Sequence, residues 1–256
     1  MIRYEHNPVK EKLRAGKPCI GVSIVSTSPI CAETMAQVGW DWLLVEAQHS
    51  LIGYDDLVRC FQAITGRGPI PMARASWNDP VSIMRVLDAG AMGIVVPMVN
   101  SVEEAQHAVG ASKYAPMGFR SYGSSRIAPY VGDYFTWANE EILVVVMIET
   151  IQAVERAEEI LSVLGVDACM IGPADLAASL GLHPGEIPGH PEHEEAIQRV
   201  LAAGKKVGTP VGEFCPSAQE VWERARQGFQ MLTCGSDLGF MMAQASSEFA
   251  RIADLL

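Results

Sequence analysis

The sequence lacks long apolar segments. No run approaches the ~20 consecutive apolar residues that a membrane-spanning helix needs, although 49% of the 256 residues are hydrophobic. Residues 1–17 are charged and lack the apolar centre of a secretory signal peptide. We therefore expect a chain that does not enter membranes and that works in the cytoplasm.

Paired cysteine motifs and an excess of basic residues are also missing. The six cysteines show no C-x-x-C spacing, and three lie in apolar, strand-like runs. We therefore expect buried free thiols. With 19 Lys and Arg against 30 Asp and Glu, the net charge is −11. This charge argues against nucleic acid as a partner, and an anionic substrate needs a local cationic side chain.

What the sequence does contain is a repeated pairing of a short run rich in Val and Ile with a stretch of helical periodicity. Runs that are apolar throughout are typical of parallel strands buried on both faces. The predicted strands are 19–25, 42–48, 70–75, 93–99, 143–149, 168–172, 206–212 and 230–235. The predicted helices include 7–16, 54–66, 79–90, 101–112, 151–164, 191–204 and 217–228.

Eight such strands with helical connections predict an α/β fold, a closed (β/α)₈ TIM barrel that occupies residues 1–256 as a single domain. The alternative is an open, doubly wound sheet, which the absence of a G-x-G-x-x-G motif after the strands disfavours only weakly. Two long connections, 100–142 and 173–190, follow predicted strands. We expect both at the carboxyl end of the barrel, where active sites of such barrels lie.

Polar side chains at the ends of apolar strands are the exceptions that point to chemistry. They are Glu46, Gln48, His49, Arg74, Glu149 and Asp175. If the strand assignment holds, these side chains converge on one rim of the barrel. Glu149 and Asp175 then form a pair of oxygen ligands for Mg²⁺ or Mn²⁺ that leaves positions open for a substrate. The alternatives are an ion pair or helix-cap contact for Glu149 and a helix cap for Asp175.

Two further rim residues have a chemical and a structural interpretation each. Arg74 on an apolar strand must neutralise an anion, either a substrate oxygen at a metal site or Glu46 or Glu149 in a salt bridge. His49 is a candidate general base oriented by Glu46, or else a satisfied histidine without a catalytic role.

Two segments outside the rim also carry candidate ligands. Arg120, in the segment GFRSYG, is a candidate for binding an anionic part of the substrate, with a solvated loop as the alternative. In the segment HPEHE, His190 and His193 have a spacing that zinc could use. The flanking Pro191 and acidic residues favour a helix N-terminus instead.

At these residues the sequence resembles the HpcH/HpaI aldolase family, specifically its metal-dependent 4-hydroxy-2-oxoheptanedioate aldolase type. The matching stretches are LLVEAQHS, ARASWNDPVSIMRVLDAGAMGIVVPMVNSVEEA, KYAPMGFRS, VVVMIET and MIGPADLAASLG. The resemblance implies a barrel that exchanges its final helix between subunits, commonly in a hexamer built from dimers. It also implies reversible cleavage of a 4-hydroxy-2-oxo acid to pyruvate and an aldehyde through an enolate, with oxaloacetate decarboxylation as a side activity.

The resemblance also assigns roles to residues. It implies metal ligation by Glu149 and Asp175, with Mg²⁺ or Mn²⁺ as the ion and Co²⁺ or Zn²⁺ as alternatives. It makes His49 the general base, Glu46 its orienting partner and Arg74 the group that stabilises the enolate oxygen. The substrate carboxylate is expected at the backbone of Gly172, Ala174 and Asp175.

The sequence departs from the family pattern beside these residues. The family usually has Asp-x-Glu-His where this chain has Glu46-Ala47-Gln48-His49, and often Gln where this chain has Met147. Two other functions stay open at this point. One is cleavage of a CoA thioester such as malyl-CoA, for which no basic cluster is evident. The other is a barrel that binds a 2-oxo acid without turnover.

Overall fold

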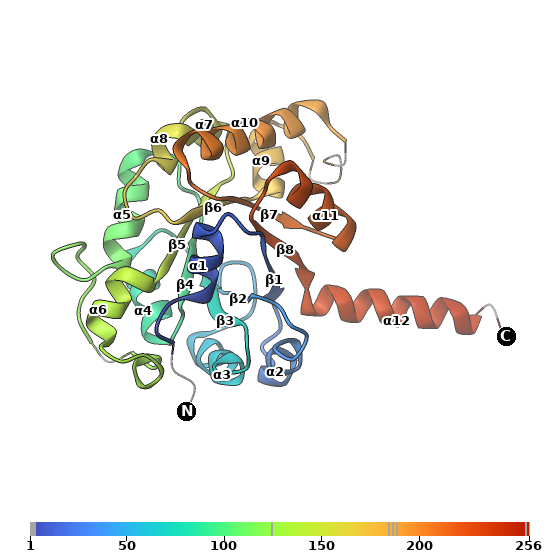
Figure 1. Cartoon of the computed structure of the whole chain (residues 1–256). Coiled ribbons are helices and arrows are strands. Elements are labelled where there is room, and N and C mark those ends of the chain that lie inside the picture. Colours follow the sequence, from blue (N-terminus) through green and yellow to red (C-terminus); the bar gives the residue numbers. More distant parts are fainter. Residues whose placement is uncertain are drawn as a thin grey trace.

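Eight parallel strands close into a barrel in chain order in the computed structural model, which describes residues 4–123, 125–183, 185, 187, 189–253 and 255 (Figure 1). This confirms the predicted TIM barrel and excludes the open sheet. The strands are β1 (Cys19–Ile24), β2 (Trp42–Glu46), β3 (Ile70–Arg74), β4 (Gly93–Val96), β5 (Leu143–Ile148), β6 (Ala168–Ile171), β7 (Val211–Cys215) and β8 (Met231–Ser236).

Helices cover the barrel, and most begin at capping residues visible in the sequence. The Ser101 hydroxyl, for example, accepts the Glu104 N–H. The helices are α1 (Pro8–Arg14), α2 (Pro29–Met35), α3 (Tyr54–Ile64), α4 (Pro80–Asp88), α5 (Val102–Ser112), η1 (Ala128–Tyr130), α6 (Tyr134–Glu141), α7 (Ile151–Glu155), α8 (Ala157–Leu161), α9 (Pro173–Ser179), α10 (Pro191–Val207), α11 (Ala218–Gln227) and α12 (Asp237–Ala253).

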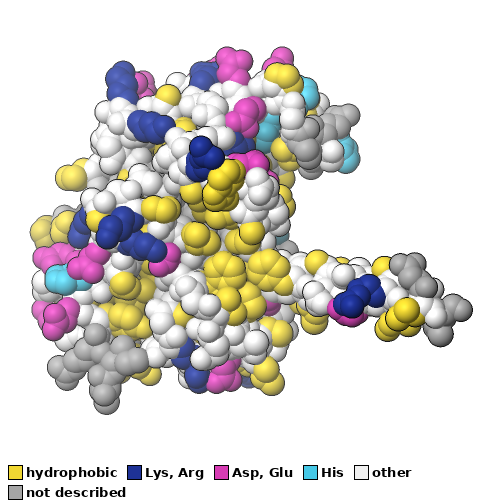
Figure 2. All heavy atoms as spheres, turned by 45° about the vertical axis from the view of Figure 1, so that its right-hand side comes forward, with side chains coloured by type: hydrophobic (Ala, Val, Ile, Leu, Met, Phe, Trp, Pro, Cys, Tyr) yellow, Lys and Arg dark blue, Asp and Glu magenta, His cyan; other side chains and the backbone are white. Residues whose placement is uncertain are grey.

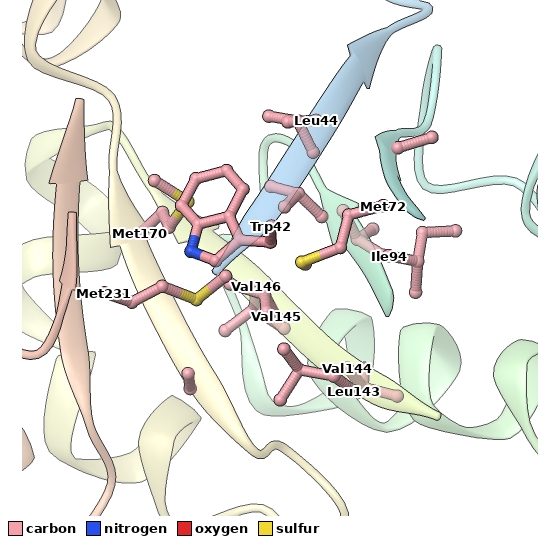
Figure 3. Packing of buried hydrophobic residues seen from close by; sticks show 14 of the residues in the cluster. Trp42, Leu44, Met72, Ile94, Leu143, Val144, Val145, Val146, Met170 and Met231 are labelled. Carbon is pink, nitrogen blue, oxygen red and sulfur yellow. The ribbon is translucent and has the colours of Figure 1, made fainter. Parts of the chain in front are cut away.

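Large apolar side chains fill the interior of the barrel. Figure 3 shows Trp42, Met72, Met170 and Met231 gathered between the strands, and all four are fully buried. A β-carbon on Gly21 would lie 2.1 Å from the Trp42 ring, so the indole needs glycine on the neighbouring strand. The interior is therefore a packed core, and any binding site must lie above it, at the rim.

The seventh strand is the element that the sequence placed wrongly. We predicted 206–212, but α10 continues to Val207 and ends at Gly208, which has φ 82°, so that β7 begins only at Val211. Gly204, where we predicted the helix to end, lies inside α10. Glycine is needed there because a β-carbon would come 2.2 Å from Val211 Cγ2. Close helix–strand packing explains this glycine.

The connection 100–142 is also placed differently from our expectation. Because α5 carries the chain back along the barrel, residues 113–123 and 125–133 lie at the amino ends of the strands. Arg126 N–H donates to Asp88 O at 2.9 Å, at the end of α4, and Ser125 Oγ donates to Leu87 O. The expectation that this connection belongs to the carboxyl rim therefore holds for its start, where Asn100 accepts a hydrogen bond from Thr150, and is wrong for the segment after α5.

The last helix, α12, extends away from the barrel (Figure 1). It carries the exposed apolar residues Leu238, Phe240, Met241, Met242, Phe249 and Ile252. Figure 2 shows apolar side chains along this helix and on the barrel surface beside its base. Its first turns pack on the barrel, where Phe240 stacks on Trp40 with ring centroids 6.3 Å apart. Of the helices in the described parts of the chain, none is long and apolar enough to cross a membrane.

Candidate active site

The carboxyl ends of four strands bring the predicted rim residues together. Glu46 and Arg74 are paired in register at the ends of β2 and β3. Glu149 directly follows β5, and Asp175 lies in the first turn of α9, just after β6. Parallel strands end at one edge, so three carboxylates and a guanidinium that are distant in sequence share one mouth of the barrel.

Glu149 is the most deeply buried of these groups. It is 1% exposed, and its Oε1 accepts the Met98 N–H at 2.6 Å. Its buried Oε2 has no hydrogen-bond partner among the described residues. Burial raises the pKa of Glu149 to about 7; the Met98 N–H counteracts this rise, and the neighbouring Asp175 carboxylate adds to it. An orphaned, buried carboxylate oxygen beside a second carboxylate fits a divalent cation.

The backbone around Glu149 makes room for its carboxylate. A β-carbon on Gly172 would lie 2.4 Å from Glu149 Oε2, so only glycine fits there. Met98 has φ 55°, a left-handed conformation that is rare for a residue with a side chain and that accompanies the N–H donation to Glu149. Met98 could not be recognised from the sequence, because its contribution is a backbone amide.

Arg74 has the salt bridge that we named as one of its two interpretations. Its Nε and one terminal nitrogen both lie 2.6 Å from Glu46 Oε2. The other terminal nitrogen is 3.8 Å from the sulfur of Met147, and the guanidinium lies over the Phe214 ring, 5.3 Å from its centroid. Its positive charge also lowers the pKa of Glu149. The salt bridge therefore fixes the Arg74 guanidinium beside the carboxylates of Glu149 and Asp175.

Glu46 orients the backbone of His49 and not its ring, which differs from our expectation. Glu46 Oε1 accepts the N–H groups of Gln48 at 2.7 Å and His49 at 3.1 Å. Glu46 Oε2 is taken by Arg74. Both carboxylate oxygens are thus engaged, and the exposed His49 imidazole makes no hydrogen bond within the described part of the chain. His49 therefore lies on a loop whose backbone Glu46 holds in place.

Arg120 does not join these residues. Its buried guanidinium donates to Asp88 at 2.6 Å and to the Tyr134 hydroxyl at 3.1 Å, and it lies over the ring of Tyr114. These partners belong to the amino end of the barrel. In its own chain, Arg120 therefore anchors the connection after α5 instead of facing the rim.

The histidines of HPEHE belong to a helix start, as the flanking residues favoured. Pro191 opens α10, with Glu192 and Glu194 in the first turn. His193 is buried and its Nε2 lies 2.9 Å from Pro173 O. Across the described residues, no three His, Cys, Asp or Glu side chains form a metal-binding group.

A cavity of about 760 Å³ adjoins the rim, and sequence reasoning missed it. It is lined by Ala174, next to Asp175, and by Phe214, the residue beneath Arg74. Thr233 of β8 and residues of α10 and α11 complete the wall. Phe214 was not recognised as a strand residue, because the predicted seventh strand ended at residue 212.

Comparison with known proteins agrees with this geometry. Residues 20–243 match the model of the HpcH/HpaI aldolase/citrate lyase family. The 4-hydroxy-2-oxo-heptane-1,7-dioate aldolase of Klebsiella pneumoniae subsp. pneumoniae is 43% identical over 211 residues, 79% of each chain. The enzyme of that name from Shigella sonnei is 36% identical over 249 residues, covering 96% of this chain and 94% of its own.

A solved structure extends the agreement to the fold. An HpcH/HpaI aldolase/citrate lyase family protein from Burkholderia cenocepacia superposes with a TM-score of 0.91 at 31% identity, covering 96% of this chain and 99% of that one. The sequence match and the shared fold span nearly the same residues as the barrel and its rim. The chain belongs to the HpcH/HpaI aldolase/citrate lyase family.

Proposed function

We propose that this chain is a divalent-metal-dependent aldolase that reversibly cleaves a 4-hydroxy-2-oxo acid to pyruvate and an aldehyde. The observation that carries the proposal is the orphaned Oε2 of buried Glu149 beside Asp175, with the Arg74 guanidinium at the same mouth. The names of the relatives support an aldolase. Oxaloacetate decarboxylation, which passes through the same enolate, is the expected side activity.

Glu149 and Asp175 would hold the cation, with Mg²⁺ or Mn²⁺ as the ions that suit carboxylate ligands best. When bound, such an ion supplies Lewis-acid chemistry that polarises a keto group. Gly172 leaves room beside Glu149, and the N–H groups of Ala174 and Asp175 at the start of α9 would hold the substrate carboxylate.

Arg74 and His49 divide the remaining chemistry. Arg74, held by Glu46, stabilises the negative charge that develops on the keto oxygen. His49 accepts the proton of the 4-hydroxyl group, directly or through a water molecule. The C3–C4 bond then breaks, the hydroxyl carbon leaves as an aldehyde, and the bonding electrons remain on pyruvate as an enolate.

We also propose that α12 is exchanged between subunits in a homo-oligomer. Its apolar face is exposed in the single chain, and Figure 1 shows it extending from the barrel. Association that covers this face buries the apolar surface. Deleting residues 237–256 should therefore reduce the number of subunits per particle, which light scattering measures.

The function is tested by pyruvate proton exchange and by aldol addition, each measured after exhaustive chelation and after Mn²⁺ addition. We expect chelation to abolish both reactions and Mn²⁺ to restore them. Glu149→Gln should not respond to Mn²⁺, whereas the exposed control Glu155→Gln should behave like the parent. Full activity without metal would contradict the proposal, and binding of pyruvate without any proton exchange would identify a non-catalytic barrel.

A further inference from the structure

The cavity beside the rim reaches the candidate active site around the end of β7. Phe214 and Thr233 are partners in register on β7 and β8, and both line the cavity. Gly212 and Met231 form the pair two residues earlier, and Met231 lies inside the barrel (Figure 3). Because side chains alternate along a strand, Thr233 also points into the barrel. The cavity thus begins at the mouth that holds Arg74.

Thr233 carries the observation that points to a polar ligand. The residue is 1% exposed, and its Oγ1 finds no hydrogen-bond partner in the described part of the protein. Buried hydroxyl groups are normally paired, since an unpaired one loses its bonds to water without replacement. A ligand hydroxyl in the cavity would satisfy Thr233.

Another part of the cavity lining, the acidic wall, carries four glutamates. Glu194, Glu213, Glu220 and Glu223 line it, and Arg224 is the one Lys or Arg side chain on the described lining. Burial raises the pKa of Glu213 to about 8, with Arg224 acting against this rise and Glu220 adding to it. Glu213 therefore carries its proton at neutral pH, and the carboxylates of Glu194, Glu220 and Glu223 are the acceptors for hydroxyl groups.

Arg224 is not free to balance an incoming carboxylate. Its terminal nitrogens donate to both oxygens of Glu194 at 2.7 and 2.8 Å, and its Nε lies 2.7 Å from Glu213. Its side chain is only 9% exposed. With the guanidinium engaged on every side, an anionic ligand meets Glu220 and Glu223, which no further Lys or Arg of the described lining offsets.

We propose that this cavity receives the far end of the acceptor aldehyde and favours a neutral, hydroxylated tail over a tail that ends in a carboxylate. The inference rests on the proposed aldolase function. Hydroxyl groups of the tail would bond to Thr233 and to the acidic wall, while the Phe214 ring packs against its carbon chain. The two relatives are named for a heptane-1,7-dioate, whose far end is a carboxylate, so the tail favoured here differs from the one in their names.

The test is kcat/KM for aldol addition of pyruvate, with Mn²⁺ present, to aldehydes compared with their unsubstituted parents. Glyceraldehyde should react better than propanal, and succinic semialdehyde worse than butanal. Thr233→Val should lower the glyceraldehyde-to-propanal ratio about 2- to 10-fold, the value of one net hydrogen bond. Thr233→Ser should restore it, and the exposed control Thr34→Val should leave it unchanged.

A second variant tests whether the acidic wall disfavours a tail that ends in a carboxylate. Glu220→Gln should raise the succinic semialdehyde-to-butanal ratio about 2- to 5-fold, the range for one partly exposed charge. Succinic semialdehyde reacting better than butanal in the parent protein, or a Thr233→Val variant with an unchanged ratio, would overturn the inference alone. Failure of every aldehyde to react would overturn the aldolase function, and the inference with it.

Discussion

The raised pKa of Glu149 predicts a pH-dependent destabilisation of the metal-free protein. The pKa is about 7 in the folded chain, against 4.5 for an ordinary glutamate side chain. Between these values the folded state binds more protons than the unfolded state, so stability falls as pH rises from about 4.5 to 7. The penalty is fully present above pH 7. Glu149→Gln removes the titrating charge and should therefore remove the penalty.

The size of the effect follows from the shift. The difference between about 7 and 4.5 corresponds to ~3 kcal/mol, because each unit is worth about 1.4 kcal/mol. Glu149 is 1% exposed, so solvent screening does not reduce this figure strongly. For a chain of this size, ~3 kcal/mol corresponds to about 6–12 °C in Tm.

The assay is thermal unfolding in the presence of chelator at pH 5 and at pH 8. Glu149→Gln should melt above the parent at pH 8 and close to it at pH 5, whereas the exposed control Glu155→Gln should follow the parent at both. Added Mn²⁺ should raise the Tm of the parent and not that of Glu149→Gln. If Glu149→Gln melts at or below the parent at pH 8 without metal, the buried Glu149 carboxylate does not destabilise the folded protein.

Three further predictions concern the rim. His49→Ala should lower kcat for aldol cleavage about 100-fold or more with little change in the KM for pyruvate, because a general base acts on the proton and not on binding; steady-state kinetics measure both, and equal turnover would remove His49 from the mechanism. Arg74→Lys should lower kcat about 100-fold, because an ammonium cannot keep the two contacts to Glu46 and also face the substrate. A near-normal kcat would contradict the role of Arg74 in stabilising the enolate oxygen. Gly172→Ala should weaken Mn²⁺ binding about 10-fold or more, because its β-carbon meets Glu149 Oε2; calorimetry with Mn²⁺ measures this, and unchanged affinity would count against the site.

The barrel and its rim carboxylates could be predicted because their signals are local in sequence. Apolar runs mark strands buried on both faces, and Glu149 stands out because a charge directly follows such a run. Once eight parallel strands are assigned, the convergence of their carboxyl ends follows from topology. The same logic brought Arg74 and Asp175 to the site.

What could not be predicted depends on contacts between distant segments. Gly204 resembles a helix stop until Val211 is known to pack against it. Arg120 resembles a ligand residue until α5 is seen to return the chain to the amino end, where Asp88 binds it. Glu46 was expected to orient the His49 ring, but the Arg74 side chain and two backbone N–H groups occupy its oxygens.

We expect Glu149 and Asp175 to share one dication at the mouth of the barrel. Anomalous diffraction at the manganese edge, from crystals soaked with Mn²⁺ and pyruvate, tests this arrangement directly. One strong peak should lie about 2.0–2.3 Å from an oxygen of each carboxylate, with pyruvate beside Arg74. A peak at the HPEHE segment, or none near Glu149, would contradict it.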